Sequence, residues 1–171
     1  QVSLCAPAIA RVNPDAVLFS FHGLPVRQVA AQESVEGLCN RVDPCPPLTD
    51  ANRRCYRAQC FRTAEAIAQG LGLARSSFRI CFQSRLGRTE WIGPATDRVL
   101  DDLAREGVRR IMVTSPAFVA DCLETIEEIG IRYRARWKEL GGEAFELVPC
   151  LNSSAEWIDA AAQIVVDHHE Q

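Results

Sequence analysis

The chain has 171 residues, 47% of them hydrophobic, which is enough to bury one core of ordinary size and favours a single domain. A net charge of −3 and dispersed arginines and lysines argue against a nucleic-acid partner. No apolar run approaches the roughly 18 residues needed to cross a bilayer, and no secretory leader opens the sequence. We therefore expect a soluble, cytoplasmic protein.

Hydrophobic runs alternate with helical stretches along the chain. Strands are expected at about 16–21, 79–84, 109–114 and 144–149, and helices at about 52–70, 94–106, 120–140 and 154–168. Four such strand and helix units predict an α/β fold, with a Rossmann-like, parallel four-stranded sheet flanked by helices. The connection at about 23–51 is unusually long, and such connections are usually functional.

Reactive side chains follow the expected strands. His22 follows the first, Gln83-Ser84-Arg85 the second, and Asp121 and Glu124 come shortly after the third. Because ligands bind beyond the carboxyl ends of parallel strands, these segments should converge on one pocket. An imidazole at position 22 could bind a metal or accept a proton, although a histidine that only hydrogen-bonds at a strand end is the simpler alternative.

Three carboxylates are expected on one face of the third helix. Asp121, Glu124 and Glu128 fall at i, i+3 and i+7, and opposite an imidazole they would suit a divalent cation or a general-base pair. A solvated acidic first turn, favoured by the helix dipole, is the alternative. Phe118 and Trp91 could form a flat apolar wall or simply belong to the core.

The eight cysteines fall into two groups. Without a secretory signal they are expected to be reduced, and Cys81 and Cys150 are expected in the core. The other group has the spacing C-x5-C-x9-C-x4-C, which lacks the C-x2-C pairs of structural zinc sites and could hold a [2Fe-2S] cluster, zinc or no metal: Cys39, Cys45, Cys55 and Cys60.

Several motifs together resemble the ferrochelatase family. They are SFHGLP at 20–25, FQSRLG at 82–87 with EWIGPATD at 90–97, AFVADCLET at 117–125 and PCLN at 149–152. Their order and spacing agree with the family over nearly the whole chain, which corresponds to the C-terminal half of that enzyme. The stretch at about 37–60 resembles the cysteine-rich insertion of microbial members that carry a [2Fe-2S] cluster, in a structural or redox-sensing role.

The resemblance implies insertion of Fe²⁺ into a porphyrin, protoporphyrin IX or coproporphyrin III, in haem biosynthesis. It places His22 and Glu124 beside the macrocycle centre, where His22 is the easier proton acceptor because its unperturbed pKa is about 6.5. Asp121 and Glu128 would form an acidic conduit for metal ions or protons, although Cys122 and Arg132 depart from the family pattern. The resemblance also implies substrate-binding positions, which are Trp91, Phe118 and Ser20.

The resemblance implies a partner, because the porphyrin cleft of the family lies between two halves. An N-terminal half or a second copy of the chain would supply the other wall. Two alternatives are a self-paired short tetrapyrrole chelatase and a non-catalytic iron–sulfur sensor or interaction module on the same fold. Peripheral membrane contact is a plausible route for receiving a porphyrin, although no amphipathic anchor is visible in the sequence.

Overall fold

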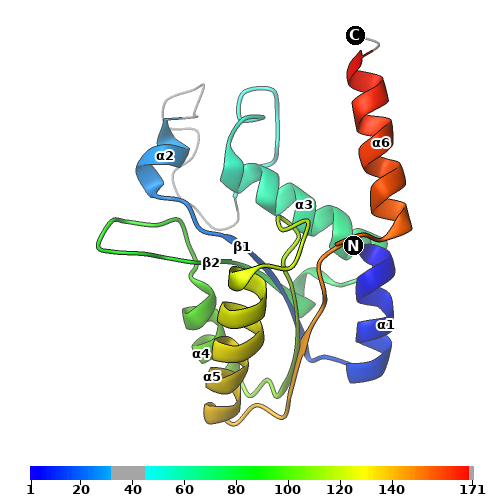
Figure 1. The fold of residues 1–171 in the computed structure, drawn as a ribbon. Helices are drawn as coiled ribbons and strands as arrows, with labels where there is room; N and C mark the ends of the chain where they lie inside the picture. Colours follow the sequence, from blue (N-terminus) through cyan, green and yellow to red (C-terminus); the bar gives the residue numbers. More distant parts are fainter. Residues whose placement is uncertain (32–44, 170–171) are drawn as a thin grey trace.

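The computed structural model describes residues 1–31 and 45–169. Its centre is a four-stranded, wholly parallel sheet in the order β2-β1-β3-β4 (Figure 1). The strands are β1 (Ala16–His22), β2 (Phe78–Gln83), β3 (Arg110–Thr114) and β4 (Ala144–Leu147). The expected α/β class with a parallel sheet is therefore confirmed.

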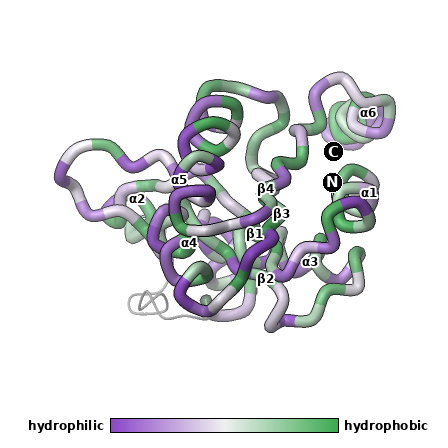
Figure 2. The backbone as a smooth tube through the Cα atoms, turned by 90° about the horizontal axis from the view of Figure 1, so that it is seen from below, coloured by the Kyte–Doolittle hydropathy of each residue, from purple (hydrophilic) through white to green (hydrophobic). Residues whose placement is uncertain are grey.

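Helices cover both faces of this sheet (Figures 1 and 2). Helices α1 and α3 pack on one face, whereas α4, η2 and α5 pack on the other. Helix α6 extends away from the sheet next to α1 (Figure 1). The bounds are α1 (Val2–Val12), α2 (Val26–Ala30), α3 (Tyr56–Gly70), the 3-10 turn η1 (Arg75–Ser77), α4 (Thr96–Arg105), η2 (Glu124–Tyr133), α5 (Arg134–Glu139) and α6 (Ala155–His169).

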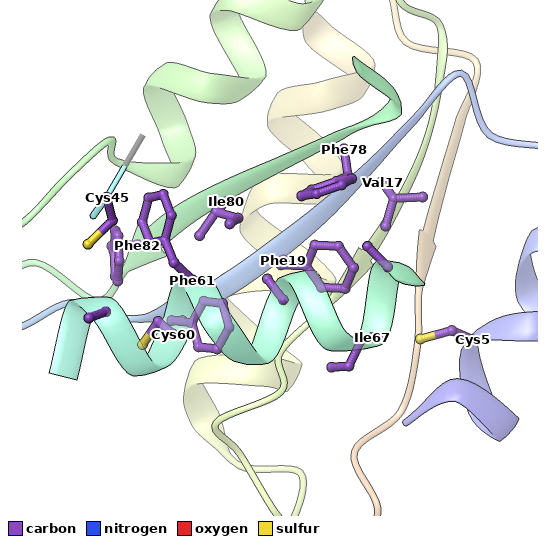
Figure 3. Packing of buried hydrophobic residues seen from close by; sticks show 14 of the residues in the cluster. Cys5, Val17, Phe19, Cys45, Cys60, Phe61, Ile67, Phe78, Ile80 and Phe82 are labelled. Atoms are coloured by element: carbon purple, nitrogen blue, oxygen red, sulfur yellow. The ribbon is translucent and has the colours of Figure 1, made fainter. Parts of the chain in front are cut away.

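Strand β1 is buried on both sides, as expected of a strand inside a parallel sheet. Its alternate residues Val17, Phe19 and Phe21 enter the cluster beneath α1 and α3, part of which Figure 3 shows. There the ring of Phe19 meets that of Phe78 edge-on, with centroids 5.5 Å apart. Leu18 belongs to the cluster on the opposite face of the sheet. Strand β1 is therefore packed on both faces, and its carboxyl end lies beside the carboxyl end of β2.

Two elements differ from the expectation. Residues Val2–Val12 form a helix to which the sequence analysis assigned no structure, because Pro7 inside it normally opposes a helix. The helix expected at 120–140 is a π-helix, η2, from Glu124 to Tyr133 and an α-helix only from Arg134. The prediction of one α-helical face was therefore wrong, and Asp121 precedes the helix.

The connection at 23–51 contains the short helix α2, and its residues 32–44 lie outside the described part of the chain. Helix α3 begins at Tyr56, later than the expected start near Asn52. Among the described residues, no helix combines the length and apolar character needed to cross a membrane.

Candidate functional site

Three chain segments meet at the carboxyl edge of the sheet. His22 ends β1 and lies opposite Gln83, the last residue of β2. The loop that follows β3 leads to Glu124, the first residue of η2, and the side-chain amide of Gln83 donates a hydrogen bond to its carbonyl oxygen at 3.2 Å. The expected convergence of these segments is therefore present.

The His22 imidazole has one nitrogen engaged. Its Nδ1 lies 2.6 Å from the Gly23 carbonyl oxygen, and because a carbonyl can only accept, Nδ1 carries the proton in the neutral ring. Nε2 then holds the lone pair that can take a proton or a metal. The ring is half-buried and lies against Phe118, with centroids 6.1 Å apart, while the Tyr56 hydroxyl donates to the His22 carbonyl. The orientation of the His22 ring is thus set by contacts on Nδ1, on the ring face and on the backbone carbonyl.

Glu124 carries an ionised carboxylate. The Cys122 thiol and the Glu124 backbone N–H both donate to it, and with a smaller contribution from the charge of His22 they lower its pKa below the ordinary value. His22 at the end of β1 and Glu124 at the start of η2 thus bring an imidazole and a carboxylate to the same edge of the sheet.

A buried polar network supports this edge from below. The Ser20 hydroxyl donates to Gln83 Oε1 at 2.7 Å and lies 2.9 Å from the Thr96 hydroxyl. Ser20 is fully buried, so it lies beneath the surface on which a substrate would rest. Gln83 was expected at this pocket as part of the segment that follows the second strand, and its register opposite His22 places it there.

The other two carboxylates point to different partners. Asp121 accepts hydrogen bonds from the Asn152 side chain at 2.8 Å and the Cys150 amide at 3.2 Å. Burial alone would raise the pKa of Asp121, but these bonds lower it. Glu128 is 7% exposed and accepts hydrogen bonds from Ser84. The three carboxylates expected along one helix face thus have separate surroundings.

The segment 84–91 projects beyond the carboxyl end of β2 (Figure 1). Trp91 in this segment donates from Nε1 to the Leu86 carbonyl at 3.1 Å and packs near Gly23. Trp91 lines a cavity of about 350 Å³ together with the buried Arg57, and it also lines a polar cavity of about 700 Å³. Phe118 lies against His22 and Trp91 lies near the adjacent Gly23, and both aromatic side chains are partly exposed.

Three of the four clustered cysteines are described, and all are buried: Cys45, Cys55 and Cys60. Burial, with smaller contributions from the neighbouring thiols of Cys55 and Cys45, raises the pKa of the Cys60 thiol to about 12. Figure 3 shows Cys45 and Cys60 in the cluster above α3. Cys39 lies outside the described residues, and within 1–31 and 45–169 no three His, Cys, Asp or Glu side chains form a group that could hold a metal ion.

Two further cysteines, Cys81 and Cys150, are buried as expected. Burial raises the pKa of Cys81 to about 11, which suits a packing role.

Comparison with known proteins gives a consistent result. A model of the ferrochelatase family matches residues 3–169. The ferrochelatase of Coxiella burnetii (strain Dugway 5J108-111) is 46% identical over 152 residues, which cover 89% of this chain and 43% of that protein. The ferrochelatase of Legionella pneumophila (strain Lens) is 48% identical over 149 residues, which cover 87% of this chain and 44% of that protein. The chain spans less than half the length of these curated relatives, and it belongs to the ferrochelatase family.

Proposed function

We propose that this chain supplies one wall of a site that inserts Fe²⁺ into a porphyrin, either protoporphyrin IX or coproporphyrin III, in haem biosynthesis. The observation that carries the proposal is the meeting of a nitrogen base, His22, and an ionised carboxylate, Glu124, at one edge of the sheet. The relatives of this chain are named ferrochelatase. They are about twice its length, so the other wall would come from a further half or from a second copy.

The reaction requires a proton acceptor and a metal donor. As Fe²⁺ bonds to the four ring nitrogens, the two pyrrole N–H bonds break and two protons leave, with no change in oxidation state. His22 Nε2 would accept a proton, because the hydrogen bond from Nδ1 to the Gly23 carbonyl leaves the lone pair of the neutral ring on Nε2. Glu124 would present the metal, since a carboxylate binds Fe²⁺ only moderately and can release it.

The aromatic side chains near His22 suit a flat macrocycle. Phe118 and Trp91 would contact the porphyrin faces, while Ser20 would hold Gln83 in place from below. Asp121 would extend the acidic line from Glu124, as the resemblance implies. The same resemblance would add Glu128, but this buried carboxylate already accepts hydrogen bonds from Ser84 and Tyr133, and we leave it out of the conduit.

We further propose that the cysteine-rich segment carries a [2Fe-2S] cluster. Four thiols are what such a cluster requires, and three of them are buried in one cluster with the start of α3, where Cys55 and Cys45 raise the pKa of Cys60. Its role would be structural or redox-sensing. Anaerobically purified protein should contain about two irons and two sulfides per chain, lost in Cys39→Ser. Finding one zinc ion per chain, or no metal, would refute the cluster and favour the zinc-bound or the metal-free alternative.

The proposed activity also predicts where in the cell the protein works. A haem-synthesising enzyme of this type would work in the cytoplasm and could receive its porphyrin at a membrane surface without spanning it. Vesicle sedimentation with and without porphyrin would test that contact.

Anaerobic mixing with Fe²⁺ and each porphyrin tests the activity, with loss of porphyrin fluorescence as the readout. His22→Ala and Glu124→Gln should each reduce the rate by about 10²-fold or more. Glu127→Gln is the matched control, because this exposed carboxylate lies in the same turn and pairs with Arg132. An intact protein that lacks insertion activity while retaining its cluster would favour the non-catalytic iron–sulfur module.

A further inference from the structure

Glu128 is a buried carboxylate near the site, and protein donors surround it. Its Oε1 accepts hydrogen bonds from the Ser84 backbone N–H at 3.0 Å and the Tyr133 hydroxyl at 2.9 Å. Its Oε2 accepts one from the Ser84 hydroxyl at 2.7 Å. Proximity of this carboxylate raises the pKa of Tyr133, as burial does, so the phenol remains a donor. Both oxygens of Glu128 are therefore occupied by protein donors.

Ser84 is held in an uncommon conformation. Its φ is 66°, in the left-handed region that residues other than glycine seldom adopt. Ser84 directly follows β2, and the two hydrogen bonds to Glu128 hold it there. Glu128 thus fixes the way in which the chain leaves the sheet beside His22.

The last residue of β2, Gln83, and the residue after it, Ser84, form hydrogen bonds with successive turns of η2. Gln83 donates to the carbonyl of Glu124, and Ser84 donates to the side chain of Glu128. Gln83 also lies opposite His22 in the register of β1 and β2. The position of Glu124 relative to His22 therefore depends on these contacts.

We propose that Glu128 is a positioning residue, a latch that holds η2 against the end of β2 and thereby sets the separation of Glu124 from His22. It would not itself carry metal ions or protons. Arg132 supports this assignment, because its guanidinium lies 4.0 Å from Glu128 Oε1 and repels a divalent cation. The inference rests on the proposed function of the same site.

The substitution Glu128→Gln distinguishes a positioning role of Glu128 from a role in conducting metal ions or protons. A glutamine can keep all three contacts, because its oxygen can accept from the Ser84 N–H and the Tyr133 hydroxyl while its NH₂ donates to the Ser84 oxygen. It lacks the negative charge that a metal or proton relay requires. Alanine removes both the charge and the contacts.

The test compares kcat and the KM for Fe²⁺ in the active enzyme and in Glu128→Gln and Glu128→Ala, with Glu127→Gln as the control for charge. The latch predicts that Glu128→Gln keeps kcat within about twofold and that Glu128→Ala lowers kcat by about 10 to 100-fold at an unchanged KM for Fe²⁺. A Glu128→Gln variant as impaired as Glu128→Ala, with a raised KM for Fe²⁺, would overturn it.

Hydrogen exchange at the Ser84 amide gives a readout that does not depend on activity. Protection should persist in Glu128→Gln and fall in Glu128→Ala, and equal protection in both would contradict the latch. If Glu128→Ala does not fold, Tyr133→Phe replaces it, because it removes one contact and keeps the charge. An unmodified protein that lacks insertion activity when the other wall of the cleft is present would refute the proposed function, and exchange at Ser84 would still decide whether the latch exists.

Discussion

Gly23 is the position at which a single added methyl group should affect both stability and the site. It follows His22, and its amide donates to the Gln83 carbonyl oxygen at 2.7 Å. A Cβ at this position would lie 2.8 Å from that oxygen and 3.4 Å from the Trp91 ring. The oxygen belongs to the backbone of β2, so it cannot rotate away, and the end of one strand must move.

The expected cost of Gly23→Ala follows from these two contacts. Overpacking of this kind costs about 1–3 kcal/mol. Weakening the hydrogen bond to Gln83 adds about 1 kcal/mol. The free energy of unfolding should therefore fall by about 2–4 kcal/mol, and the proposed insertion rate should fall by at least about tenfold, because His22 and Trp91 are displaced together.

Urea unfolding and the porphyrin assay measure these two effects, with Gly107→Ala as the control. Gly107 has a φ of 84° and no neighbouring atom that a Cβ would meet, and it ends α4 away from the site. Its substitution should cost about 1–2 kcal/mol through backbone strain alone and leave the insertion rate of the folded protein unchanged. An unaltered unfolding free energy in Gly23→Ala, or equal activity in the two variants, would refute the reasoning.

Three further substitutions test single contacts. Cys122→Ala removes the thiol that donates to Glu124, so the pKa of Glu124 should rise and activity should disappear at a higher pH as the solution is acidified; an unchanged pH–rate profile would contradict this. The hydrogen bonds of Arg110 lower the pKa of Asp15 to about 2, so the carboxylate stabilises the fold above its ordinary pKa of about 3.9 and this contribution is lost as the pH falls toward 2. Because the pair is about one-third exposed, Asp15→Asn should cost under about 1 kcal/mol at pH 7, and the difference from the unmodified protein should vanish near pH 2 in urea unfolding. Thr125→Val leaves the Cys122 amide without the hydroxyl that accepts from it at 2.9 Å, which should cost about 1–3 kcal/mol in the same assay, whereas Thr125→Ser should cost less than half as much.

The sheet and the centre of the site could be predicted because both depend on local patterns. Hydrophobic runs of strand length place three of the strands, β1 to β3, within about a residue of their observed bounds. The rule that ligands bind beyond parallel strands then brings His22 and Glu124 to one edge without any knowledge of tertiary contacts. Both predictions need only the positions of the strands along the chain and the residues that follow them, and these can be read from the sequence.

The π-helix could not be predicted in the same way. Its hydrogen bonds join residues five apart, and the residue types from Glu124 to Tyr133 are compatible with an ordinary α-helix. The α-helical spacing that grouped Asp121 with Glu124 and Glu128 therefore does not apply. Helix α1 was missed for a related reason, because the packing of Cys5 and Ala8 against the sheet outweighs the local effect of Pro7.

Tertiary partners then give these carboxylates different chemistry. Asp121 is held by Asn152, and a metal that bound it would first have to break hydrogen bonds worth about 1–3 kcal/mol each when a charged group is involved. Glu128 is held in the same way by Ser84. Glu124 has a thiol, a weak donor, as its side-chain partner, and remains half-buried at the site surface. We therefore expect that a divalent cation arriving at this edge would bind Glu124 more readily than Asp121 or Glu128.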